Sequence, residues 1–178
     1  MHRPRPTKLG HLVLKVRDIQ VSVRFYTDVV GLEVSDWIDD RMVFLRAGTD
    51  HHDLALLQMT PDEIAHSLAA PSRIEHFSYH LPGLAEMRAA VEMLRERGIA
   101  IDRGLGKHGP GDNTFIVFLD PDGNNVEFYS DMIRVDEQHP HRARIWPGGD
   151  METFDQWHLE NFVVPPPARI ARLLDKGK

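Results

Sequence analysis

The chain has 178 residues, of which 42% are hydrophobic and 27% are charged, and its formal net charge is −6. This length and composition suit one globular domain, or two small modules that share a core, while the negative charge gives no reason to expect nucleic acid and no apolar run is long enough to cross a membrane. Cysteine is absent, which excludes disulfides, thiolate metal sites and a cysteine nucleophile and suits a reducing cytoplasm.

The first 70 residues predict a strand, a helix, three strands and a short helix. Residues 1–8 are basic with no apolar run behind them, so we expect a flexible arm and not a secretory signal. Residues 9–17 alternate apolar and polar side chains, and Asp18 is placed to cap a helix that Gly31 ends. Three strand-like runs follow, at 32–38, 41–47 and 53–59, before a capping box at 60–63 opens a helix to about Ala69.

The same order of elements then repeats after a linker at 70–72. A strand is predicted over 74–81, and a helix over 83–97 has an apolar face and ends at Gly98. Further strands are predicted at 99–103, 113–120 and 125–130. The economical interpretation is an α+β chain of two βαβββ modules, 9–70 and 71–131, that act as one domain. Residues 132–178 belong to neither module and are predicted to be a C-terminal extension that wraps the modules, covers a site or joins subunits of a homo-oligomer.

Three residues on predicted strands suggest a metal site. His11 and His76 occupy equivalent positions of the repeat, 65 residues apart, and Glu127 lies on the last strand. Side chains alternate across a strand, which places all three on the mixed faces opposite the apolar ones. Two histidines and one carboxylate form a facial set that favours non-haem Fe(II), with Mn(II) as the alternative. His80 shares a face with His76, but the repeat favours His76.

Several segments resemble the vicinal oxygen chelate superfamily, which includes glyoxalases, antibiotic-resistance proteins and extradiol dioxygenases. They are Leu9-Gly10-His11-Leu12, residues 25–32 (FYTDVVGL) and residues 120–127 (DPDGNNVE), and the resemblance covers 9–131. It implies that the paired modules form a half-open barrel around a divalent metal held by the predicted triad.

Two more segments resemble the extradiol ring-cleavage branch. His52, two residues before Leu54-Ala55, matches the histidine that serves that branch as an acid–base group, and His108, 19 residues before Glu127, matches a histidine that contacts the substrate. The resemblance implies cleavage of a catechol-type aromatic diol by O2. One departure is Val117, where this branch usually has tyrosine ten residues before the glutamate.

Two other functions remain open from the sequence. A glyoxalase-like isomerase or lyase would need a fourth ligand from the first module, where the repeat places about Leu56 at the position of Glu127 and Gln58 on the same face. A leucine cannot bind a metal, so three ligands are predicted, which leaves positions for a diol and O2. A non-catalytic binding protein of the same fold would bind no metal at all.

Overall fold

The computed structural model describes residues 9–67, 74–142, 146–147 and 149–174. The predicted arm at 1–8 and the whole of the predicted linker at 70–72 lie outside these residues, as does the boundary between the predicted modules. The chain divides into two compact units. Unit 1 comprises Met1–Arg73 with Asp120–Asp122, and unit 2 comprises Ile74–Leu119 with Gly123–Lys178.

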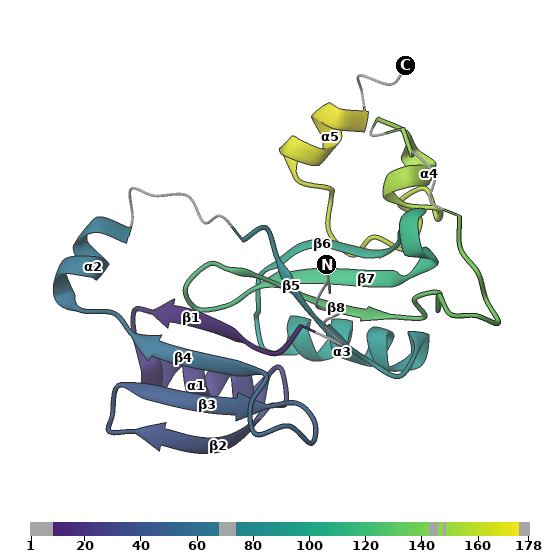
Figure 1. Cartoon of the computed structure of the whole chain (residues 1–178). Helices are drawn as coiled ribbons and strands as arrows, with labels where there is room; N and C mark the ends of the chain where they lie inside the picture. The colour runs from purple at the N-terminus through teal and green to yellow at the C-terminus, as the bar shows by residue number, and fades with distance from the viewer. Residues whose placement is uncertain (1–8, 68–73, 143–145, 148, 175–178) are drawn as a thin grey trace, which may run out of the picture. The chain divides into compact units, whose positions relative to one another are not determined.

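Unit 1 contains the first predicted set of elements. They are β1 (Leu12–Val16), α1 (Ile19–Asp28), β2 (Glu33–Ile38), β3 (Met42–Arg46), β4 (Leu54–Gln58) and α2 (Pro61–Ser67). The strands form one mixed sheet in the order β1-β4-β3-β2, in which β1 and β4 are parallel and the other pairs antiparallel. Parallel strands need a crossover, which α1 begins. Figure 1 shows α1 beside this sheet.

Asp18 starts α1 as predicted, because its carboxylate accepts hydrogen bonds from the backbone N–H groups of Gln20 and Val21, both at 3.0 Å. The helix buries Phe25 and Tyr26. Tyr26 also donates its hydroxyl to Asp120 at 2.7 Å, so the Asp-Pro-Asp segment 120–122 is part of this unit's packing.

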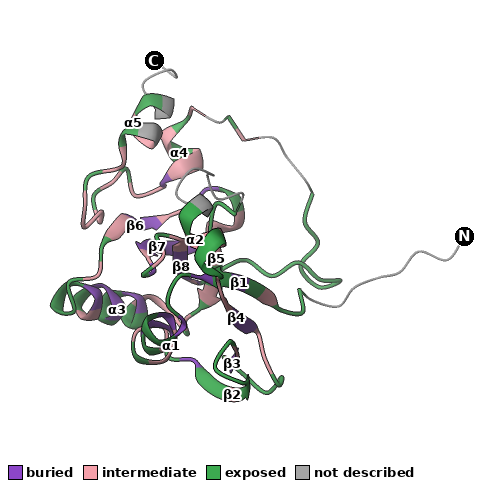
Figure 2. Ribbon diagram, turned by 90° about the vertical axis from the view of Figure 1, so that its left-hand side faces the viewer, coloured by how far each residue is buried: buried purple, intermediate pink, exposed green. Residues whose placement is uncertain are grey.

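Unit 2 repeats the topology and adds the C-terminal extension. Its elements are β5 (Phe77–His80), α3 (Leu84–Glu96), β6 (Ile101–Lys107), a 3₁₀ turn (Pro110–Asp112), β7 (Thr114–Leu119), β8 (Asn125–Ser130), α4 (Met151–Phe154) and α5 (Ala168–Leu174). The sheet order is β5-β8-β7-β6, with β5 and β8 parallel. The apolar side of α3 buries Met87, Val91 and Leu94. In unit 2 the buried residues lie on β6, β7, β8 and this helix face, whereas β2 of unit 1 is mostly exposed (Figure 2).

The predicted α+β fold of two βαβββ repeats is confirmed, and neither four-stranded sheet closes on itself. The strand predicted at 99–103 runs instead from Ile101 to Lys107. The reason is that two register shifts, at residues 101–103 and at Gly104–Gly106, let a glycine-containing segment continue to pair with β7. Among the described residues, no helix has the length and apolar character that crossing a membrane requires.

Candidate metal and substrate site

Unit 2 brings together two of the three predicted metal ligands. Glu127 lies in the middle of β8, and only 5% of its surface is exposed. One carboxylate oxygen accepts a hydrogen bond from the Ser78 hydroxyl at 2.8 Å. The other lies 3.7 Å from Nε2 of His76. This second distance is longer than a hydrogen bond, so Nε2 of His76 and this Glu127 oxygen are not hydrogen-bonded to each other.

These two side chains fit a divalent metal ion. A buried carboxylate is costly unless a partner compensates its charge, and the Ser78 hydroxyl is neutral. Ligand atoms about 2.1 Å from one ion lie at most about 4.2 Å apart. The 3.7 Å between His76 Nε2 and Glu127 lies within that limit. Imidazole nitrogen with carboxylate oxygen is also a donor set that Fe(II) and Mn(II) accept.

A charged pair that the sequence did not reveal orients His76. Nδ1 of His76 hydrogen-bonds the Glu75 carboxylate, which can only accept, so in the neutral ring Nδ1 carries the proton and Nε2 has the lone pair. The buried guanidinium of Arg103 binds both Glu75 oxygens at 3.1 Å. Burial raises the pKa of the Glu75 carboxyl, but the hydrogen bond from His76 and the charge of Arg103 outweigh it and lower that pKa overall. A carboxylate behind a ligating histidine is a common support of metal sites.

Unit 1 places the other predicted ligand beside the predicted acid–base histidine. The rings of His11 and His52 have centroids 4.6 Å apart, and Phe44 packs edge-on against His52 at 4.9 Å. Nδ1 of His52 lies 3.0 Å from Nδ1 of His51, whose Nε2 bonds Asp36 at 2.8 Å. Since the Asp36 carboxylate accepts, a neutral His51 offers its Nδ1 lone pair to His52. Nδ1 of His52 then donates, and its Nε2 is left as a proton acceptor.

From the sequence, His51 was only a neighbour of His52. No local pattern predicted that Asp36 would bind His51 or that Arg103 would bind Glu75. Asp36 lies 15 residues from His51 and Arg103 lies 28 residues from Glu75. The sequence offered one kind of signal for these contacts: Glu75 is adjacent to His76, and His51 is adjacent to His52.

His108, which directly follows β6 in unit 2, is half-buried. Its ring stacks on Phe115 with centroids 3.8 Å apart and planes 5° apart. Nδ1 lies 2.9 Å from the carbonyl oxygen of Phe154, so it donates and leaves Nε2 as an acceptor. Burial lowers the pKa of His108 below its ordinary 6.5, although the hydrogen bond to Phe154 and the charge of Glu127 act the other way. The ring is therefore neutral at pH 7.

This lowered pKa predicts a loss of stability in mild acid. Below pH 6.5 the unfolded chain binds a proton that native His108 does not, so the free energy of unfolding falls as pH decreases toward the native pKa. We expect the unfolding temperature of the native chain to fall more steeply as the pH drops below about 6.5 than that of His108→Asn, whose amide keeps a donor for Phe154. Thermal unfolding followed by circular dichroism measures both slopes, and equal slopes would contradict the burial of a neutral ring.

The position in unit 1 that corresponds to Glu127 carries no ligand. Glu127 pairs with Ser78, which lies two residues after His76. In unit 1 the residue two positions after His11 is Val13, and it pairs with Ala55. This corrects the predicted equivalent, Leu56, by one residue. The conclusion is unchanged, because an alanine side chain cannot bind a metal.

The prediction that Gln58 shares the ligand face is wrong. It lies three residues after Ala55 on the same strand, hence on the opposite face. Its amide oxygen accepts from the backbone N–H of Ile19 at 2.8 Å, and its amide nitrogen donates to the carbonyls of Arg17 and Met59. These three bonds tie β4 to the start of α1 and occupy the side chain.

Val117 and His80 also have defined neighbours. Val117 is fully buried and pairs directly with Glu127 across the sheet, so an apolar side chain stands where the resemblance leads one to expect a tyrosine. The ring of His80 packs edge-on against Tyr129 at 5.3 Å. In unit 2 it is thus His76 whose nitrogen faces the buried carboxylate.

The three predicted metal ligands are divided between the two units. His11 lies with His52 in unit 1, and His76 lies with Glu127 in unit 2. Within the described part of the chain, no group of three or more histidine or acidic side chains is placed to hold a metal ion.

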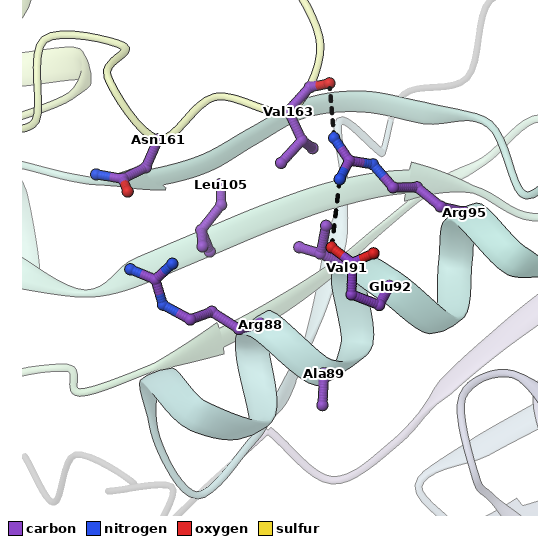
Figure 3. Close-up of a pocket in the computed structure, with 8 residues that line it drawn as sticks. All are labelled: Arg88, Ala89, Val91, Glu92, Arg95, Leu105, Asn161 and Val163. Atoms are coloured by element: carbon purple, nitrogen blue, oxygen red, sulfur yellow. Dashed lines mark hydrogen bonds and ion pairs between the residues drawn. The ribbon is translucent and has the colours of Figure 1, made fainter.

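A surface groove of unit 2 lies apart from these residues. It runs between α3 and the C-terminal extension, and Arg95 spans it with hydrogen bonds to Glu92 and to the carbonyl of Val163 (Figure 3). None of the predicted site residues lines it.

The chain is similar to proteins of known family. A family model described as the Glyoxalase/Bleomycin resistance protein/Dioxygenase superfamily matches residues 8–128. The chain is 28% identical over 162 residues to metapyrocatechase 2 of Cupriavidus necator, covering 88% of this chain and 46% of that protein. It is 30% identical over 128 residues to catechol-2,3-dioxygenase of Bacillus subtilis (72% and 43%).

A third relative, from Geobacillus genomosp. 3, is named manganese-dependent 2,3-dihydroxybiphenyl 1,2-dioxygenase and is 29% identical over 140 residues, covering 78% of this chain and 41% of the relative. The chain thus spans about half the length of these relatives. Among solved structures, an integron cassette protein from the mobile metagenome of the Halifax Harbour sewage outfall superposes with a TM-score of 0.57 at 21% identity, over 70% of this chain and 99% of that one. This likeness concerns the fold.

Proposed function

This chain belongs to the Glyoxalase/Bleomycin resistance protein/Dioxygenase superfamily, and from that premise we propose that it is an extradiol dioxygenase. It would cleave the ring of a catechol-type diol beside the two hydroxyl groups and add both atoms of O2, giving a ring-opened hydroxymuconate-type semialdehyde. No external reductant is needed for this balance. The dioxygenase names of the relatives support the reaction class.

The observation that carries this proposal is the asymmetry of the two repeats. Both carry a histidine at the same position, but unit 2 has a carboxylate, Glu127, where unit 1 has Ala55. Two histidines and one carboxylate leave more positions open than a four-ligand site does. A glyoxalase-like site would use a fourth protein ligand, and Gln58 is committed elsewhere.

His11, His76 and Glu127 would hold the metal, with Fe(II) as the first choice and Mn(II) as the second. The manganese dependence stated in the name of the Geobacillus relative supports a divalent ion. When bound, such an ion lowers the pKa of a coordinated hydroxyl and brings diol and O2 together.

The chain's own residues would handle the protons. His52, whose Nδ1 contacts His51 and through it Asp36, would use its Nε2 to accept a proton from a diol hydroxyl and return it later. Neutral His108 would use its Nε2 to hold the diol oxygen by accepting a hydrogen bond. The apolar Val117 beside Glu127 would help to keep water away from that carboxylate.

The test is the dependence of turnover on metal and oxygen. Protein loaded anaerobically with Fe(II) or Mn(II) is expected to consume one O2 per diol from a panel of catechols, and to be inactive without O2. Activity supported by Ni(II) or Zn(II) in the absence of O2 would replace this proposal with the isomerase or lyase. Binding of small molecules by protein that takes up no metal would replace it with the binding protein.

A further inference from the structure

The C-terminal extension has a segment, residues 150–163, that is fastened along β6; we call it the C-terminal strap. Its anchor is Asp155, which is fully buried. One carboxylate oxygen of Asp155 accepts from the backbone N–H groups of Lys107 at 2.7 Å and Trp157 at 3.2 Å, and the other accepts from Leu159 at 2.7 Å. Trp157 and Leu159 belong to the strap itself, so the Lys107 N–H is the donor by which the buried carboxylate fastens the strap to β6, and undocking the strap would lose that bond.

Two glycines of the β6 region make room for the strap. A Cβ atom on Gly106 would lie 2.8 Å from the ring of Phe162 and closer still to Phe115. A Cβ on Gly109 would collide with the Glu152 carbonyl and lie 2.7 Å from the Trp146 ring. Gly109 has φ −67° and ψ −59°, which any residue adopts, so the close approach of the strap is what requires glycine there.

The strap converges on His108. The carbonyl of Phe154 accepts from its Nδ1 at 2.9 Å, and the Gln156 amide donates to its backbone carbonyl at 3.0 Å. The Gln156 backbone N–H also donates to the carbonyl of Lys107 at 2.7 Å. The ring is fixed at one edge by the strap and on one face by Phe115.

A purely structural role would account for part of this. β6 is one of the two edge strands of its sheet, and the strap satisfies Lys107 N–H and the carbonyls of Lys107 and Gly104, which blunts that edge. Blunting an edge does not require a carbonyl aimed at an imidazole nitrogen or a side-chain amide on the same residue. The contacts to His108 are therefore the ones that call for a functional explanation.

We propose that the C-terminal strap is the positioning element of His108, holding its ring as the Nδ1-protonated tautomer so that Nε2 is the acceptor offered to the substrate. Asp155 and Gln156 are then positioning residues that act through His108. The functional half of this inference rests on the proposed dioxygenase activity, whereas the tautomer is a property of the protein by itself.

The first measurement is the tautomer of His108 by ¹⁵N NMR of the metal-free full chain, assigned by its loss in His108→Ala. The native protein is expected to show the Nδ1-protonated form alone. Asp155→Ala and Gly109→Ala, which loosen the strap from opposite sides, are expected to give a mixture of tautomers. Gly48→Ala is the matched control, because its Cβ meets nothing within 4 Å. A tautomer that both strap variants leave unchanged while they stay folded would overturn the inference.

The second measurement is a double-mutant cycle on kcat. If His108→Ala lowers kcat about 100-fold, Asp155→Ala is expected to lower it by about 10-fold in the native background and to add nothing in the His108→Ala background. Additive losses would show that the strap acts on stability and not through His108. Full activity of His108→Ala would refute the proposed role of His108 in turnover, while the NMR result would still decide whether the strap fixes its tautomer. Should Asp155→Ala not fold, Gln156→Met replaces it, since it removes the bonds to His108 and Asp112 but keeps the length.

Discussion

Replacing Glu127 with glutamine is expected to remove metal binding while leaving the fold intact. The amide can still accept from the Ser78 hydroxyl, and losing a buried charge does not destabilise the metal-free protein. Loss of a residue behind a ligand typically weakens metal affinity 10- to 100-fold, so loss of a ligand should weaken it by more than about 100-fold. Titration with Mn(II), followed by electron paramagnetic resonance of the free ion, measures this affinity.

Thermal unfolding gives a second reading of the same change. A metal at about 100 times its dissociation constant stabilises the native state by about 2.7 kcal/mol, and this increment should vanish in Glu127→Gln. Glu92→Gln is the matched control, because Glu92 is an exposed carboxylate of the same unit, and it should keep the full increment. Equal Mn(II) affinity in Glu127→Gln and the native chain would remove Glu127 from the metal site.

Replacing His52 with alanine is expected to lower kcat by about 10²- to 10⁴-fold and to leave the metal affinity and KM nearly unchanged. The reason is that His52 is assigned to move a proton and not to hold the metal or the diol. Steady-state oxygen uptake with a catechol substrate, together with Mn(II) titration of the same protein, separates these quantities.

His51→Ala gives the graded comparison. It removes the acceptor that keeps Nδ1 of His52 protonated, so a loss of kcat smaller than that of His52→Ala is expected. His139→Ala is the inert control, since His139 is exposed and pairs with Asp136, three residues before it, and not with any of the predicted site residues. A His52→Ala variant with native kcat, or with weakened metal binding as its main defect, would contradict the assigned role.

The sequence predicted the repeated βαβββ order because that order has local causes. The Asp18 cap, Gly31 and Gly98 after the two long helices, and the alternation of 9–17 are all properties of neighbouring residues. Most bounds differ by one to three residues from those observed, and β6 extends furthest because its register shifts depend on pairing with β7. Pairing across a sheet leaves no periodic trace within one strand.

The supports of the site could not be predicted for the same reason. Leu56 was predicted as the equivalent of Glu127 because counting residues along two strands does not give the register of their pairing. The observed register makes Ala55 the equivalent, and Gln58 therefore lies on the opposite face. Arg103 reaches Glu75, and the strap reaches His108, through contacts 28 and 46 residues apart in sequence. The strap contact to His108 also uses a backbone carbonyl, which every residue carries, so no residue type identifies it.

The most direct test of the central claim is the product itself. Fe(II)-loaded protein mixed with a catechol under air is expected to give a yellow product whose mass equals that of the diol plus one O2, with matching oxygen uptake, and Glu127→Gln is expected to give none. A product with the mass of the starting compound, or a product formed equally well without oxygen, would contradict ring cleavage by this chain.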